Sequence, residues 1–314
     1  MKIHLHQLLL LSAASKCLFV DARFANVTTC ESTYPYTFNS GDTTAATTII
    51  SIDEAPWIQL DLSGTKLADG AILTIAGKTA TQVITSKELS SLNDFSAVFD
   101  GSSVSVELSS AEKEDIRGGK AKAPSRSRVV VPSVNVGLCK DEGIIGESIC
   151  GDTDDRVPST DVRAGRIGGC TGWLISERAF IQAGHCGTPS SSTRIHFVFG
   201  VESAPPEDQY AVDVSSYQGV NGGVGNDWGA GRLLPNSVTG KLPGVAQSEK
   251  CGSPGCGWYT LGTVPASTSG KNIRITGYGT AAVASRSQKT HAGALVSIAS
   301  TSLAYIPDTT VSSF

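Results

Sequence analysis

Two neighbouring segments, GGCTGWLI at residues 168–175 and AFIQAGHC at residues 179–186, decide the fold of the second half of this chain. Each contains a run of apolar residues next to glycine or polar turn residues, a pattern typical of a β-strand. Each also carries one cysteine. A disulfide between Cys170 and Cys186 would close the loop between adjacent strands and stabilise the fold by about 3 kcal/mol in the chain-entropy model. It would also hold His185 at the end of the second strand.

A histidine held in this way suits general-base catalysis, because the ring must keep both its tautomer and its distance to a nucleophile. His185 is therefore a candidate catalytic residue, and a structural histidine beside a disulfide is the alternative interpretation. His196 and His291 have no comparable sequence surroundings. We expect these two to be ordinary strand or surface residues.

The composition is that of a globular, β-rich chain. Its 314 residues are 40% hydrophobic and 17% charged, which excludes disordered and collagen-like proteins. The net charge of −4 argues against nucleic acid or an anionic membrane as partner, since both favour a basic surface. A chain of this length predicts about two domains.

The N-terminus predicts a secreted protein. Residues 1–22 read as a signal peptide, with Lys2, a short apolar run at Leu8–Leu11 and small residues up to Ala22. This run is too short to span a bilayer, so we expect an extracellular protein without stable membrane insertion. The sequon at Asn26 is consistent with secretion and glycosylation, and an unused sequon is an equal alternative.

The cysteines point to disulfides. Cys17 leaves with the signal peptide, so eight cysteines become seven, and an odd number in an oxidising compartment leaves one without a partner. No Cys-x-x-Cys pair is present, so a zinc site is not expected, and we predict neither a metal nor a cofactor. The short spacing within two further pairs of cysteines favours a disulfide in each pair, and by elimination Cys30 then has no partner. These pairs are Cys139–Cys150 and Cys251–Cys256.

The first half of the mature chain predicts a small β-sandwich over residues 23–137, as an accessory module or pro-region. Its short segments are β-branched or alternating and are separated by turn residues. The expected strands are Thr47–Ile52, Trp57–Leu62, Ala71–Ile75, Gln82–Thr85, Ala97–Phe99, Val104–Leu108 and a closing strand Val129–Val131. No clustered histidines, paired carboxylates or phosphate-binding loop occur here.

Two segments separate this region from the second domain, which we place at residues 151–314. Residues 112–128 are charged and read as a solvated, protease-sensitive loop or linker, and residues 138–150 as a linker. Arg126, Arg128 and Arg156 offer processing sites near the boundary, should the sandwich be an inhibitory pro-region.

The segments around Cys170 and His185 resemble the catalytic-histidine region of trypsin-like serine proteases, most closely the glutamyl-endopeptidase-like branch. Three further segments are similar to parts of that family. These are GDTDDRV at 151–157, where the mature domain of that branch begins, GNDWGAGRL at 225–233, which bears the catalytic aspartate, and IRITGYG at 273–279, a strand of the second barrel. The resemblance covers residues 151 to about 310 and implies an all-β double barrel.

The resemblance also implies roles for individual residues. His185 would act as general base, and Asp227 would accept a hydrogen bond from its other ring nitrogen. An ordinary turn carboxylate is the alternative for Asp227. The family's serine lies in a Gly-x-Ser-Gly segment soon after an Asp-Thr pair, but here IPDTT at 306–310 leads to Ser312 and Ser313, which no glycine flanks. We assign neither as nucleophile, and we expect a truncated second barrel.

Three hypotheses about function follow. We favour a secreted serine endopeptidase, a hydrolase of proteins or peptides, whose serine segment is missing from a truncated or alternatively ended form. The second is a non-catalytic homologue that binds a protein partner through the barrel surface. The third is a carbohydrate- or surface-binding protein led by the sandwich. On the first hypothesis this chain should show little or no peptidase activity, and His185→Ala should change nothing in it.

Overall fold

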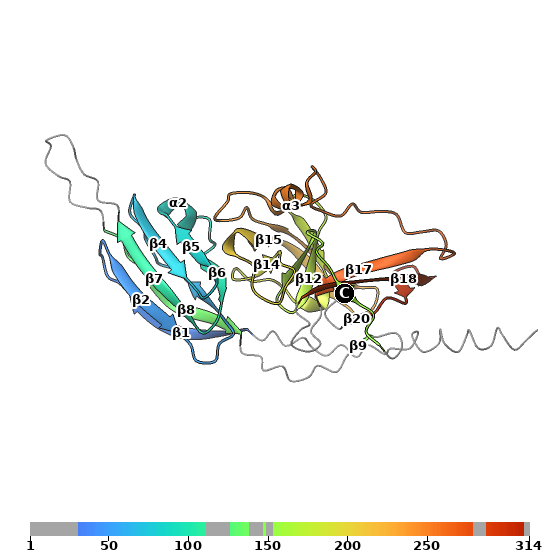
Figure 1. Cartoon of the computed structure of the whole chain (residues 1–314), viewed down its shortest axis with the longest axis horizontal. Coiled ribbons are helices and arrows are strands. Elements are labelled where there is room, and N and C mark those ends of the chain that lie inside the picture. Colours follow the sequence, from blue (N-terminus) through green and yellow to red (C-terminus); the bar gives the residue numbers. More distant parts are fainter. Residues whose placement is uncertain (1–30, 111–125, 138–146, 149–152, 279–286, 311–314) are drawn as a thin grey trace, which may run out of the picture.

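The computed structural model describes residues 31–110, 126–137, 147–148, 153–278 and 287–310, and it confirms the expected all-β class. Its strands form a sandwich early in the chain and a barrel with an adjoining sheet later (Figure 1). The signal peptide, Asn26, Cys30, Cys139, Cys150, Ser312 and Ser313 lie outside the described residues. None of the described helices is both long and apolar enough to cross a membrane.

The sandwich module, residues 31–137, consists of two four-stranded antiparallel sheets in the orders β1-β8-β3-β6 and β2-β7-β4-β5. A four-residue helix, α2 (Ser86–Leu89), follows β5. The strands are β1 (Glu31–Asn39), β2 (Ala46–Ser51), β3 (Trp57–Asp61), β4 (Ala71–Ala76), β5 (Thr81–Ile84), β6 (Phe95–Asp100), β7 (Ser103–Ser110) and β8 (Val130–Gly137).

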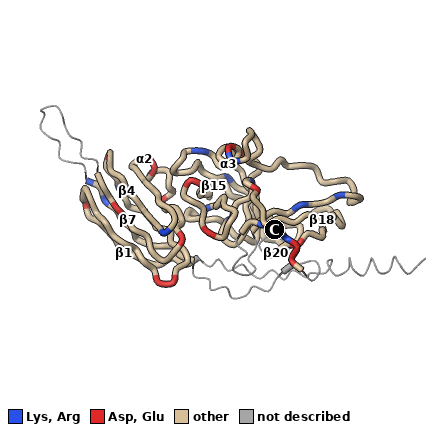
Figure 2. The backbone as a smooth tube through the Cα atoms, viewed as in Figure 1, with Lys and Arg blue, Asp and Glu red and all other residues tan. Residues whose placement is uncertain are grey.

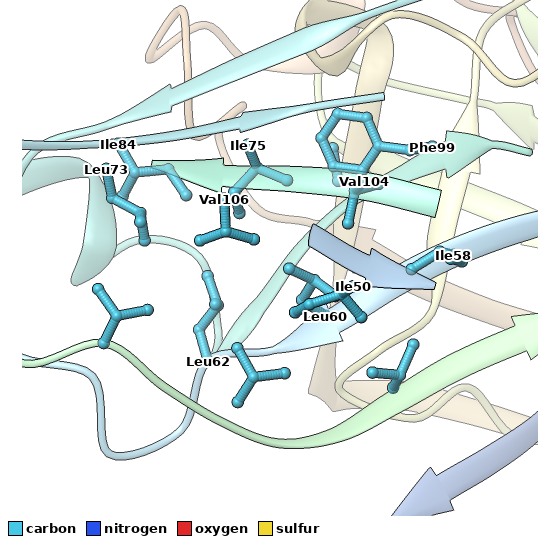
Figure 3. Packing of buried hydrophobic residues seen from close by; sticks show 14 of the residues in the cluster. Ile50, Ile58, Leu60, Leu62, Leu73, Ile75, Ile84, Phe99, Val104 and Val106 are labelled. Carbon is cyan, nitrogen blue, oxygen red and sulfur yellow. The ribbon is translucent and has the colours of Figure 1, made fainter. Parts of the chain in front are cut away.

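The apolar core of the sandwich lies between these two sheets. Along β7, buried Val104, Val106 and Leu108 alternate with exposed residues, because successive side chains of a strand point to opposite faces. Figure 3 shows Val104 and Val106 beside Ile50, Ile75 and Phe99 from neighbouring strands. The alternation that was visible in the sequence therefore corresponds to one buried and one exposed face.

Two strands of the sandwich differ from the sequence expectation. The sequence did not predict β1, whose pairing with β8 shifts register between Pro35 and Phe38, as expected of an edge strand that contains a proline. The expected closing strand Val129–Val131 extends to Gly137 and lies between β1 and β3. A cut at Arg126 or Arg128 would therefore leave an interior strand of the sandwich attached to the second domain.

The second half of the described chain begins with a closed six-stranded barrel in the order β11-β12-β13-β16-β15-β14. Phe180, Ile195, Tyr210 and Leu233 fill its interior and are fully buried. Its elements are β11 (Ala164–Ile167), β12 (Cys170–Leu174), β13 (Ala179–Gln182), the 3₁₀ turns η1 (Gly184–Cys186) and η2 (Pro206–Asp208), β14 (Arg194–His196), β15 (Gln209–Asn221) and β16 (Asp227–Leu233).

A second antiparallel sheet combines β10, which precedes the barrel, with strands that follow the barrel and helix α3 (Pro243–Cys251). It has the order β10-β18-β17, with β19 also paired to β18, and within the described residues it does not close on itself. A separate pair joins β9 to β20, so residues expected to be a linker contribute a strand. The strands are β9 (Glu147–Ser148), β10 (Val157–Pro158), β17 (Asn272–Tyr278), β18 (Gln288–Ile298), β19 (Leu303–Tyr305) and β20 (Thr309–Thr310).

Polar contacts from Arg194 and Gln209, the first residues of β14 and β15, hold the sandwich against the barrel. The buried guanidinium of Arg194 donates to the carbonyl oxygens of Leu92 and Phe95 at 3.1 and 2.9 Å. The Gln209 side chain accepts the N–H of Val98 and donates to its carbonyl oxygen, both at 2.8 Å. Because buried polar groups require partners, this interface depends on close docking of both modules. Figure 2 shows charged residues dispersed over the two modules.

His196 in β14 makes the stability of the folded chain dependent on pH. It is a buried strand residue whose Nδ1 accepts the N–H of Ala204. Burial, with the positive charges of Arg166 and Arg194, lowers its pKa to about 3. In the unfolded chain the pKa lies near 6.5, so as pH falls from about 6.5 toward 3 the unfolded state binds a proton that the folded state does not.

We therefore expect the free energy of unfolding to fall by about 1 kcal/mol between about pH 6 and pH 5 because of His196 alone. Urea denaturation at a series of pH values measures it. His196→Asn keeps an acceptor without a titrating ring and should flatten this part of the curve. The same slope in both proteins would contradict the prediction.

Candidate active site

His185 lies in a tight turn that the barrel holds from both sides. The turn η1 follows β13, and we call residues 184–187 the histidine turn. Cys186 is bonded to Cys170 at the start of β12, with their Cα atoms 6.1 Å apart. The pair expected from the sequence therefore ties the histidine turn to a neighbouring barrel strand. Cys251, the last residue of helix α3, and Cys256 form the other disulfide of the described residues.

The structure brings Asp227 against His185, although 42 residues separate them in sequence. One oxygen of the Asp227 carboxylate accepts the backbone N–H of His185 at 2.7 Å, and the other lies 2.6 Å from Nδ1 of the ring. The side chains are only 7% and 11% exposed. Double anchoring of this kind orients the imidazole and favours the tautomer protonated on Nδ1, so that Nε2 is the basic nitrogen.

Strand pairing explains how these two residues meet. β13 pairs antiparallel with β16, with Gln182 opposite Gly229, so the end of β13 lies beside the start of β16. His185 follows β13 by a few residues, and Asp227 is the first residue of β16. The site therefore lies at one end of the barrel wall, whereas the sandwich docks near Gln209, at the opposite end of β15.

Close backbone packing brings the histidine turn onto β15. A Cβ atom added to Gly184 would lie 1.9 Å from the carbonyl oxygen of Val220 and 2.9 Å from the backbone nitrogen of Trp228. Any side chain at residue 184 would therefore push the turn away from β15 and from β16, the strand that carries Asp227. Glycine is required here for space.

The histidine and cysteines near the turn do not form an apparent metal centre. Donor atoms of Cys170, His185 and Cys186 lie within 4.8 Å of one another. Both sulfur atoms are already joined in the disulfide, so the imidazole is the one remaining ligand of the three. The closeness of these three side chains therefore does not indicate a zinc site.

The segment that follows the second sheet lies close to the start of the barrel domain. The buried carboxylate of Asp308 accepts the N–H of Asp155 at 2.7 Å, and the N–H of Asp308 donates to Nδ1 of His291 at 2.8 Å. The adjacent β20 pairs with β9. His291, expected to be an ordinary strand or surface residue, lies in β18, and its ring nitrogen accepts the N–H of Asp308 in the segment that leads to Ser312 and Ser313.

Comparison with protein-family models and with curated proteins found no match to this chain. The assignment of a function therefore depends on the geometry of His185 and Asp227. Their catalytic roles stay predictions, although the structure places them together as the sequence motifs led us to expect. Sequence reasoning missed Gly184, and it missed Gln182 and Tyr217, whose side chains donate hydrogen bonds to the carbonyl oxygen of Gly187 in the histidine turn. The QAGH run at 182–185 carries no recognisable sign of these contacts.

The disulfide that anchors the histidine turn should contribute measurably to stability. The double variant Cys170→Ser/Cys186→Ser removes a disulfide between cysteines 16 residues apart in sequence. We expect its free energy of unfolding to fall by about 3 kcal/mol. Cys251→Ser/Cys256→Ser is the matched control, because it opens a link between residues 5 apart and should cost about 2 kcal/mol. Urea denaturation compares them, and a larger loss in the control would contradict the prediction.

Proposed function

We propose that this chain is a member of the trypsin-like serine endopeptidases, with His185 and Asp227 as two members of the catalytic triad. One observation carries the proposal: a single carboxylate binds both the backbone N–H and the Nδ1 of one buried histidine. An ordinary structural histidine does not need this second anchor. A triad histidine does, because its ring must keep one orientation while it gains and loses a proton.

The chemistry follows from the positions of these groups. Nε2 of His185, the ring nitrogen away from Asp227, would take the proton of a serine hydroxyl as that oxygen attacks a peptide carbonyl. The resulting imidazolium would later return the proton to the leaving amine. Asp227 would stabilise the imidazolium through the Nδ1 hydrogen bond and would stay ionised. The substrates would be proteins or peptides.

The fold and the disulfides add support. A closed six-stranded antiparallel barrel followed by a second antiparallel sheet is compatible with a two-barrel protease. Residues 227–233 of the segment GNDWGAGRL form β16, with Asp227 as its first residue, which agrees with the motif resemblance. Two disulfides, together with the expected signal peptide, favour secretion into an oxidising compartment.

Sequencing the transcripts past the codon for Thr310, in RNA from the source cells, tests the proposal. We expect some transcripts to continue into a glycine-flanked serine, and the encoded protein to hydrolyse peptides and to react covalently with a fluorophosphonate. The 314-residue chain should do neither. If every transcript stops at Phe314, or if the longer protein hydrolyses no peptide, the proposal fails in favour of a non-catalytic homologue that binds a partner.

A further inference from the structure

The histidine turn has a second support besides Asp227. Nε2 of Gln182 donates to the phenolic oxygen of Tyr217 at 3.0 Å and to the carbonyl oxygen of Gly187 at 3.1 Å. The Tyr217 hydroxyl donates to the same carbonyl at 3.2 Å. Gln182 precedes the turn and Gly187 ends it, so these hydrogen bonds connect the two ends of the segment that carries His185.

The barrel wall provides space for this phenol. Gly219 in β15 pairs with Gly229 in β16. A Cβ added to Gly229 would lie 2.2 Å from the phenolic oxygen of Tyr217, and one added to Gly219 would lie 2.8 Å from it. Two facing glycines therefore leave a gap that the tyrosine fills. A side chain at either position would displace the hydroxyl from Gln182.

An irregularity in β15 orients Tyr217 toward this gap. The pairing of β15 with β16 shifts register between Asp213 and Gln218, which places Tyr217 among the extra residues. Such bulges re-aim side chains and often occur beside active sites. The bulge and the two glycines are independent features, and both serve the placement of one hydroxyl group.

The environment keeps this hydroxyl protonated, and therefore a donor. Burial raises the pKa of the Tyr217 phenol, the hydrogen bond from Gln182 opposes the rise, and the negative charge of Asp227 adds to it. An ordinary tyrosine already titrates near pH 10. The hydrogen bond to Gly187 is consequently present throughout the neutral range.

We propose that Tyr217 is a positioning residue for His185, which acts with Gln182 through the main chain of the histidine turn. Its hydrogen bonds go to Gln182 and to the main chain of Gly187. By holding the carbonyl of Gly187, it restrains the turn so that Nδ1 of His185 stays within 2.6 Å of the Asp227 carboxylate. The inference rests on the proposed function, because it assigns a role in that site.

Tyr217→Phe in the 314-residue chain tests this role by proton NMR. The proton on Nδ1 of His185 should give a low-field resonance, which is assigned by its absence in His185→Gln. The measured quantity is the rate at which this proton exchanges with solvent. Loss of one neutral hydrogen bond to the turn should speed this exchange about tenfold. Gln182→Met removes the other donor and should produce the same change.

Tyr210→Phe is the matched control, because Tyr210 lies in the same strand and its buried hydroxyl has no hydrogen-bond partner among the described residues. It should leave the exchange rate unchanged. Equal exchange rates in Tyr217→Phe and the unmodified chain, or equal acceleration by Tyr210→Phe, would overturn the inference. The measurement needs no turnover. Failure of the proposed function would therefore appear separately, as absent peptidase activity in the longer protein with the glycine-flanked serine, beside an intact exchange effect in the 314-residue chain.

Discussion

Replacing Asp227 by asparagine should lower kcat for peptide hydrolysis about 10⁴-fold in the longer protein with a glycine-flanked serine that the proposed function expects. The Asp227 carboxylate accepts two hydrogen bonds from His185, from the backbone N–H and from Nδ1. An asparagine can still accept one, but its amide nitrogen toward Nδ1 would donate and so favour the tautomer with the proton on Nε2. That nitrogen could then no longer take the proton of the serine hydroxyl. Initial rates with a peptide substrate measure the effect.

Asp213→Asn is the matched control for this prediction. Asp213 lies in the same barrel and faces two arginines, with its carboxylate 3.7 Å from Arg178 and 3.5 Å from Arg232. These ion pairs include exposed arginines, and such pairs contribute little to stability. The control should therefore keep its activity within about twofold. A loss of less than about tenfold in Asp227→Asn would show that Asp227 is only a structural carboxylate.

Replacing Gly184 by alanine should lower the free energy of unfolding by about 4 kcal/mol. The added Cβ would meet the Val220 carbonyl at 1.9 Å, and backbone atoms of two paired strands cannot move aside as a flexible side chain can. The histidine turn must then shift, and its hydrogen bonds to Asp227 must lengthen or break. Overpacking and lost hydrogen bonds both contribute to the expected destabilisation.

Urea denaturation and the low-field NMR resonance of His185 measure this effect together. Gly262→Ala is the matched control, because Gly262 is exposed and a Cβ there would meet no atom within 4 Å. It should change stability by less than about 0.5 kcal/mol. If Gly184→Ala unfolds at the same urea concentration as this control and keeps the resonance, then close packing on β15 does not position the turn.

Several features of the fold and site were predictable because their signals are local. Alternation over a few residues predicted the strands of the sandwich, as in Val104–Leu108. The closeness of Cys170 and Cys186 in sequence indicated a bridge that the structure contains. The AGHC and GNDWG motifs pointed to His185 and Asp227, which the structure places 2.6 Å apart at their nearest side-chain atoms.

The tertiary structure alone decided the features that depend on residues distant in sequence. Strand pairing placed β8 inside a sheet and β9 against β20, because a ladder joins strands whatever their separation along the chain. Docking of the two modules buried Arg194 against carbonyl groups about one hundred residues earlier.

The support of the histidine turn is the clearest case of this division. The sequence by itself determined an all-β chain, two local disulfides and the histidine and aspartate motifs, because each of these signals lies within a short stretch of the chain. Nothing within the sequence near Tyr217 reveals that its hydroxyl reaches Gly187, 30 residues earlier. That contact exists only because closure of the barrel brings Gly219 and Gly229 together and leaves the space that the phenol fills.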